Sequence, residues 1–325
     1  MWILLKQMII LKILIFDLLM GLCNFPFIIY SMNNNYNTLL ITEKGLENIT
    51  IKEIEKILNR NVDYNMIEKK NKILIYTNLD FEERLKLLFN SKTIDNILYK
   101  EKDKYKYFLL KNLYEREYQL KKIEKLKSTL VNKIIYYSNI KENEEILNIM
   151  DDGSFSIEQG IYIKNILPIF WRRKEISEYI DYFEKYMNIK KKVNIKIYCV
   201  NKDKNKLLLI ERNSENALVN DIIFFRRLDI EWIDLKFKEE SIDKIFTFRI
   251  KKNPELNIKD KYIFYHSNKL LKDNGKLYLL LYSYDYKKIL DNITNYIKKY
   301  SLKYVDSFYL YNYNKRLLLI VLEKI

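Results

Sequence analysis

The sequence predicts an α/β protein in which a mostly parallel sheet follows a smaller α+β domain, and three observations indicate this. Residues 146–168 read as a buried strand, a glycine turn and a helix with apolar residues at helical spacing. Strand and helix patterns then alternate to the end of the chain, as in an open parallel sheet. A shorter alternation occupies residues 36–98. With 325 residues and 48% hydrophobic content, the chain is long enough for two domains.

The first 31 residues stand apart from this pattern because they are mostly apolar, with Lys6, Lys12 and Asp17 interrupting. Such a segment is compatible with a membrane-seeking helix or with a start codon placed ahead of a true start at Met32. We therefore divide the chain into an apolar segment at 1–31, a small α+β domain at 32–112, a linker helix at 113–139 and an α/β domain at 140–325.

Composition narrows the class of partner. Lysine and arginine number 58 against 43 acidic residues, and the net charge of +15 favours a polyanion such as nucleic acid, or an anionic membrane. The abundance of Ile, Lys, Asn and Tyr also fits an AT-rich genome, which would explain part of the charge. Two cysteines and one histidine, His266, exclude a zinc cluster and a disulfide framework. A reducing compartment follows, so we expect a cytoplasmic protein, with His266 on a helix surface or half buried.

The small domain is predicted from its strand and helix patterns in order. Strands are expected at 38–41 and 73–76, and helices at 49–58 and 81–89. In the larger domain, helices are expected within 120–138, 157–166, 207–217, 261–271 and 290–297. Strands are expected at 146–149, 193–200, 222–225, 242–246, 276–282 and 316–322. Gly153 and the run Lys272–Gly275 supply turns.

These segments resemble the THUMP-domain RNA methyltransferases. The likeness is carried by Gly45-Leu46-Glu47, by Ser91-Lys92-Thr93, and by the run from Ile146 to Glu158, which has the layout of the family's first motif. It covers about Tyr36–Ile325. It implies a Rossmann-like sheet dependent on S-adenosylmethionine, preceded by a ferredoxin-like, reduced THUMP-type domain. The implied activity is methyl transfer to the exocyclic N2 amine of a guanosine, in tRNA.

The resemblance also implies a cofactor site. It would use Asn148, Gly153, Ser154, the strand-two position Asn201 with Asp203 as a stand-in, and Asp229 beside the adenine. Several of these depart from the family: Asn148 and Asn201 replace acids, Asp151-Asp152 replace cysteine-glycine, and Phe155 stands near an expected glycine, where its side chain is expected to intrude at the turn. We therefore expect cofactor binding that is weakened or lost. The combined substitutions Phe155→Gly and Asn201→Asp should tighten cofactor binding.

No catalytic residue is assigned, because the family's asparagine-proline-proline-tyrosine motif is replaced by residues 248–251, and Asn253-Pro254 comes five residues late. For RNA binding the candidates are Lys92, Arg172, Arg173 and Lys174. The last three flank Trp171, which either stacks on a nucleotide or packs into the core. Two functions remain open: an RNA methyltransferase, or a catalytically silent RNA-binding homologue. An activating protein subunit is compatible with both, whereas a membrane partner requires residues 1–31 to be a true anchor.

Overall fold

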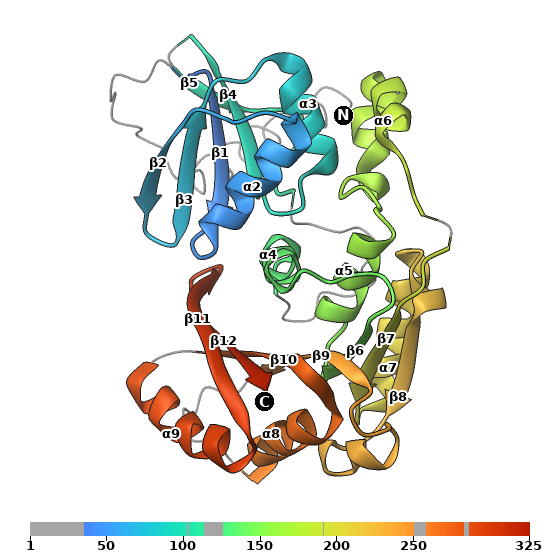
Figure 1. Ribbon diagram of the computed structural model, residues 1–325. Helices are drawn as coiled ribbons and strands as arrows, with labels where there is room; N and C mark the ends of the chain where they lie inside the picture. The colour runs from blue at the N-terminus through green and yellow to red at the C-terminus, as the bar shows by residue number, and fades with distance from the viewer. Residues whose placement is uncertain (1–35, 103, 114–125, 191, 250–257, 283–285) are drawn as a thin grey trace, which may run out of the picture. The chain divides into compact units, whose positions relative to one another are not determined.

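The computed structural model describes residues 36–102, 104–113, 126–190, 192–249, 258–282 and 286–325, apart from a few side chains within these ranges (Figure 1). The chain divides into Met1–Asn35 and Tyr36–Ile325, and every element below belongs to the second unit. The predicted segment 1–31 and Asn253-Pro254 lie outside the described residues. Within the described ranges, no helix is both long and apolar enough to cross a membrane.

The N-terminal part of this unit is an antiparallel sheet in the order β2-β3-β1-β4-β5. Its strands are β1 (Thr38–Glu43), β2 (Tyr64–Lys69), β3 (Lys72–Thr77), β4 (Asn96–Glu101) and β5 (Lys104–Tyr107). Helices α2 (Glu47–Leu58) and α3 (Phe81–Asn90) pack their apolar residues on it, and α3 begins with a capping box at Asp80 and Glu83. The chain order β1-α2-β2-β3-α3-β4 with this strand order is the ferredoxin-like arrangement, as expected.

The C-terminal part is a seven-stranded sheet in the order β11-β12-β10-β9-β6-β7-β8 (Figure 1). Its strands are β6 (Glu145–Ile149), β7 (Lys196–Asn201), β8 (Ile223–Arg227), β9 (Ile242–Arg249), β10 (Leu271–Tyr282), β11 (Leu302–Asn312) and β12 (Lys315–Lys324). β6 pairs in parallel with both β7 and β9, whereas β12 runs antiparallel to β10 and β11. The strand order therefore reverses at β6, which creates a topological switch point there.

Helices cover both faces of this sheet and make two cores. They are α4 (Ser128–Ser138), α5 (Ser154–Ile163), η1 (Phe170–Tyr179), α6 (Ile180–Tyr186), α7 (Lys204–Asn216), η2 (Asn220–Ile222), η3 (Ile230–Leu235), α8 (Ile258–Leu270) and α9 (Tyr286–Lys299). α4, α5 and α7 contribute to one core, whereas η3, α8 and α9 contribute to the other. The α/β class is confirmed. Strands β2, β4, β5 and β11 were not predicted, and the expected turn at 272–275 lies inside β10, where its register with β9 shifts.

A buried charge cluster joins the small sheet to the segment around α4. Lys72 Nζ lies 2.8 Å from Glu43 Oε1 and 2.6 Å from Asp95 Oδ2. Lys127, directly before α4, also pairs with Glu43, and Lys133 within α4 donates to the Glu43 carbonyl oxygen at 2.5 Å. Glu43, Asp95, Lys127 and Lys133 are all at most 5% exposed. Because buried charges are costly unless paired, these contacts fix α4 against β1.

Gly45 brings the turn after β1 against β11. Its φ of +102° favours glycine, and a Cβ there would come within 2.3 Å of the Tyr309 carbonyl oxygen. The Tyr311 N–H also donates to the Lys44 carbonyl oxygen, at 3.2 Å. The Gly45-Leu46-Glu47 run singled out in the sequence therefore has a packing role between the two sheets.

Candidate functional site

The candidate site lies at the carboxyl ends of β6 and β7, beside the switch point, where open α/β sheets bind ligands. After β6 the chain turns at Gly153, whose φ of +92° lies in the left-handed region, and α5 begins at the next residue. A helix that starts directly after a strand in this way points its unpaired N–H groups toward the sheet edge. The predicted strand, glycine turn and helix are confirmed.

Two aspartates of the chain occupy these N–H groups. The Asp151 carboxylate accepts from the Phe155 N–H at 3.3 Å and from the Ser156 N–H at 3.0 Å. Asp152 Oδ1 accepts from the Ser154 N–H at 2.9 Å. Burial, followed by the neighbouring Asp152, raises the pKa of Asp151 above its ordinary value. The start of α5 is thus already faced by acidic groups, which favours a ligand with a positive charge here.

Two buried atoms at this turn have no hydrogen-bond partner: Asp152 Oδ2 and Ser154 Oγ. Their residues are only 8% and 7% exposed. A buried polar atom without a partner costs about 1–3 kcal/mol, so such atoms call for a ligand or water. Thr247 Oγ1, close to the end of β9 and paired in register with Ile149, is a third such atom. These atoms are compatible with a polar ligand or a water at this edge; Glu43 Oε2 and Thr50 Oγ1, which lie elsewhere, also lack a partner.

Asn201 and Asp203 order the turn after β7. Asn201 Nδ2 donates to the Asp151 carbonyl oxygen at 2.8 Å, and its Oδ1 accepts from the Asp203 N–H at 3.0 Å. Asp203 Oδ1 caps α7 by accepting from the N–H groups of Asn205 and Lys206. Asn201 therefore holds the β6 and β7 turns together with both ends of its amide.

Asp229 comes next along the same edge. It precedes η3, is half buried, and follows Leu228, whose N–H donates to the Asn201 carbonyl oxygen at 3.3 Å. The structure thus brings Gly153, Ser154 and Asn201 together. Asp203 bonds to Asn201, and Asp229 directly follows Leu228, which also bonds to Asn201.

Asn148 is a correction to the predicted site. Its side chain is fully buried and is paired with the Gln159 amide, at 2.8 and 3.2 Å, and with Ser156 Oγ at 2.9 Å. It therefore fastens β6 to α5, and protein partners already occupy both ends of its amide.

Phe155 is a second correction. Its ring is 2% exposed and packs 5.4 Å from the ring of Phe246, within the core between α5 and the sheet. The expected intrusion at the turn does not occur. Sequence reasoning missed Asp152 and Thr247 as site residues, although the Asp-Asp-Gly-Ser run directly after a strand was a usable signal for Asp152.

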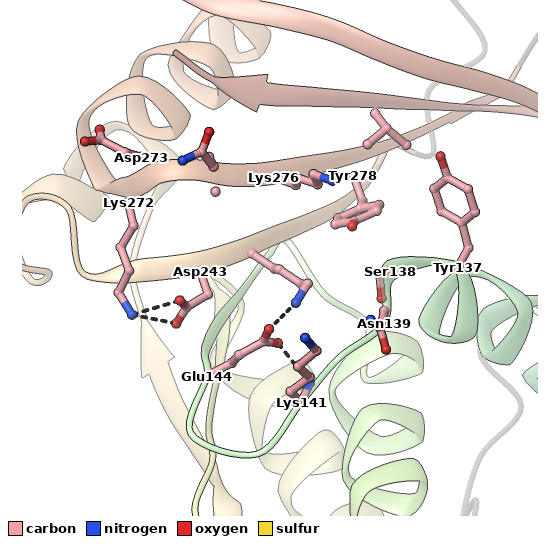
Figure 2. A pocket seen from close by; sticks show the side chains of 14 residues that line it. Tyr137, Ser138, Asn139, Lys141, Glu144, Asp243, Lys272, Asp273, Lys276 and Tyr278 are labelled. Atoms are coloured by element: carbon pink, nitrogen blue, oxygen red, sulfur yellow. Dashed lines mark hydrogen bonds and ion pairs between the residues drawn. The ribbon is translucent and has the colours of Figure 1, made fainter.

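A separate hollow of about 490 Å³ lies at the amino ends of β6, β9 and β10 (Figure 2). Two of its lysines are paired with acids: Lys244 bonds to Glu144, and Lys272 Nζ lies 2.8 Å from both Asp243 oxygens. Ligands of open α/β sheets bind at the opposite edge, so this hollow is distinct from the candidate site.

The predicted RNA-binding residues are in different settings. Lys92 is 5% exposed, and its backbone N–H donates to Glu53. Arg172 forms a two-pronged ion pair with Glu175, at 2.7 and 2.9 Å. Lys174 is exposed, whereas the Arg173 side chain lies outside the described part.

Trp171 and His266 have protein partners. The Trp171 indole N–H donates to the Asn216 carbonyl oxygen at 2.9 Å. Its half-buried ring packs on the core, which is one of the two positions expected from the sequence. His266 is fully buried in α8 with Nε2 2.5 Å from the Ile230 carbonyl oxygen, so the expected surface position is wrong. Burial lowers the pKa of His266. No cluster of metal-ligating residues occurs among the described residues.

Comparison with known proteins agrees with this architecture. A family model described as "RMKL-like, methyltransferase domain" matches residues 116–248. No curated protein matches the chain significantly.

Three solved structures share the fold. One is a possible methylase from Clostridium difficile 630, with a TM-score of 0.61 and 16% identity over 89% of this chain and 98% of that one. SMU.472, solved in complex with SAH, has a TM-score of 0.63 and 12% identity over 89% of this chain and 98% of that one. TrmN from Thermus thermophilus has a TM-score of 0.61 and 11% identity over 89% of this chain and 100% of that one. The Rossmann-like methyltransferase fold is thus shown, with the small antiparallel sheet in front of it.

Proposed function

We propose that this protein is an S-adenosylmethionine-dependent RNA methyltransferase. The observation that carries the proposal is the pair of partnerless buried atoms, Asp152 Oδ2 and Ser154 Oγ, at the switch point of a methyltransferase sheet. The match of a methyltransferase-domain family to residues 116–248, and the bound SAH of the structurally similar SMU.472, support the same cofactor.

The residues at this edge fit the polar groups of that cofactor. Asp152 Oδ2 would accept from its α-ammonium group, and the Ser154 hydroxyl would donate to its carboxylate. Gly153 lets the backbone approach closely. The Asp203 and Asp229 carboxylates are suited to ribose hydroxyls and to the adenine amine. When bound, S-adenosylmethionine supplies an electrophilic methyl group on a sulfonium, and the protein's task is to orient the acceptor.

For the substrate we propose RNA, and within it the exocyclic N2 amine of a guanosine in tRNA. The net charge of +15 supports a polyanionic partner. The nucleotide and the RNA class rest on the sequence resemblance to the THUMP-domain RNA methyltransferases. The proton of the acceptor amine has no assigned base.

A catalytically silent RNA-binding homologue is the second candidate. Two observations favour it: Asp151 and Asp152 already occupy the N–H groups at the start of α5, and the family's catalytic motif is absent from the sequence. Under this proposal the protein would bind RNA without transferring a methyl group.

The test combines cofactor calorimetry with transfer of a labelled methyl group to unmodified tRNA. We expect S-adenosylmethionine to bind, and label to appear in tRNA but not in the same tRNA already carrying N2-methylguanosine. Cofactor binding without transfer to any RNA would contradict the assigned activity. RNA binding with no cofactor binding at millimolar concentration would establish the silent homologue instead.

A further inference from the structure

A second hollow, of about 430 Å³, lies between the small sheet and the far end of α5. It is walled by Lys56 of α2, Lys92, Tyr136 of α4, Lys141, Tyr162 of α5 and Lys190. Tyr162 stands near the carboxyl end of α5, whereas the candidate cofactor edge is at its amino end. A ten-residue helix is about 15 Å long, so the two sites are separate.

Lysines outnumber acidic residues in this hollow. Four lysines line it against one acid, Glu142, which pairs with Lys190. Among the described residues, Lys56 and Lys141 take part in no ion pair, and both are exposed. In the hollow of Figure 2, Lys244 and Lys272 pair with Glu144 and Asp243, and Lys141 lines both hollows. Exposed lysines without acidic partners around a concave surface attract phosphate.

The hollow also has an aromatic wall. Tyr136 and Tyr162 are half buried and meet edge to face, with ring centroids 5.0 Å apart. The Lys92 amine lies 5.6 Å from the Tyr162 ring centroid. Lysines beside aromatic faces bind nucleotides of single strands, because the charge holds the phosphate while the ring stacks on the base.

Lys92 is held in place by a buried carboxylate. Glu53 of α2 accepts from the Lys92 N–H at 2.8 Å, from Ser91 Oγ at 2.7 Å, and from Thr93 Oγ1 at 2.5 Å and its N–H at 3.1 Å. The same carboxylate lies beside Tyr136 and, after burial, raises the pKa of that hydroxyl. The Ser91-Lys92-Thr93 loop and the tyrosine wall therefore share one anchor, as a preformed binding site requires.

We propose that this hollow binds a phosphate-bearing nucleotide of a single-stranded RNA segment. The inference rests on the proposed RNA substrate, and it adds a second point of contact outside the cofactor edge. Lys56 and Lys141 contact the phosphate groups, and the tyrosines contact the base. The hollow falls within the size range of pockets that hold one small molecule, which suits one nucleotide rather than a duplex.

The test measures binding of a fluorescent single-stranded RNA of about eight nucleotides to the full chain, with calorimetry of S-adenosylmethionine on the same samples. Changing Lys56→Glu and Lys141→Glu together should weaken RNA affinity by roughly a hundredfold at low salt and lower its salt dependence. Tyr162→Leu should weaken it about tenfold and Tyr162→Phe very little. Lys303→Glu, an exposed lysine on β11, is the matched control.

The outcomes separate the two proposals. Loss of RNA affinity in the Lys56/Lys141 variant, with unchanged cofactor binding and an unaffected Lys303 variant, supports the site. Equal losses in all charge variants, or none, would overturn it. Competition by guanosine monophosphate or inorganic phosphate at the same concentration as RNA would overturn the assignment to RNA. Failure of methyl transfer with this binding pattern intact would reject the enzymatic activity alone.

Discussion

At the scale of single residues, the cofactor assignment depends on two atoms at the start of α5. Asp152 Oδ2 and Ser154 Oγ are buried without partners, while the neighbouring Asp151 is fully used by the helix N–H groups. The free oxygen of Asp152 is therefore the group that a cationic ligand would engage, and Asp151 is the group that shapes the turn.

Asp152→Asn should weaken S-adenosylmethionine binding without unfolding the protein. Replacing the carboxylate removes a charge-assisted hydrogen bond of about 1.5–3 kcal/mol, or roughly ten- to a hundredfold in affinity. Calorimetry measures this directly. Asp273→Asn, in the hollow of Figure 2, is the control and should leave the affinity unchanged. Equal affinities for wild type and Asp152→Asn would place the cofactor elsewhere.

Phe155 should prove to be a core residue. Removing its ring by Phe155→Ala should lower the free energy of unfolding by about 3–5 kcal/mol, because the ring fills space against Phe246. Phe224→Ala on β8, where the ring is 37% exposed, should cost less than about 1 kcal/mol. Urea unfolding gives both values. If Phe155→Ala instead lowers the free energy of unfolding only slightly and tightens cofactor binding, the ring would intrude at the turn, as the sequence suggested.

At the scale of elements, sequence patterns predicted those strands and helices whose own periodicity is strong. Gly153 and the apolar run after it marked α5, whereas α7 begins at Lys204, three residues before the expected helix, because Asp203 caps it. β2 was missed because its polar, exposed sequence, Tyr64–Lys69, has no buried face. The site was predicted less well, because the direction of a side chain is set by tertiary packing: Asn148 turns toward Gln159, which no local pattern reveals.

Tertiary contacts of Asn201 also change the expected effect of an aspartate at this position. Its amide donates to the Asp151 carbonyl oxygen, and a carboxylate there could not donate and would add a third acid to the turn. The family-like aspartate at 201 is therefore expected to loosen the turn, contrary to the sequence-based expectation of tighter cofactor binding.

Helix α4 gives a pH-dependent prediction through Lys133. Burial lowers the pKa of Lys133 from 10.5 to about 8, although Asp95 and the other nearby acids oppose this. Between these two values the unfolded chain binds more protons than the folded one, so this lysine's contribution to stability increases as pH rises. Relative to Lys133→Met, the wild type should gain about 2 kcal/mol between pH 7 and pH 9.5. Urea unfolding of both proteins at the two pH values measures the difference; a constant difference would contradict the lowered pKa.

At the scale of the whole molecule, net charge governs encounter with RNA. A chain of charge +15 should bind tRNA with an affinity that falls steeply between about 50 and 200 mM salt, because bound lysines release counterions. Filter binding across that range gives the slope, and a heparin competitor gives a control for nonspecific attraction. Affinity that does not change with salt, or no binding at low salt, would remove RNA as the partner.

The buried cluster of Glu43, Asp95, Lys72 and Lys127 limits how freely the small sheet could be exchanged for another domain. Lys127 comes from the segment before α4, whereas its acids, Glu43 and Asp95, come from β1 and the loop before β4 and also pair with Lys72 of the small sheet. A chimera that grafts a different RNA-binding module onto this methyltransferase sheet would leave Lys127 and Lys133 buried without their acceptors. Because α4 also packs into the core of the larger sheet, a replacement module would have to supply new acceptors for both lysines.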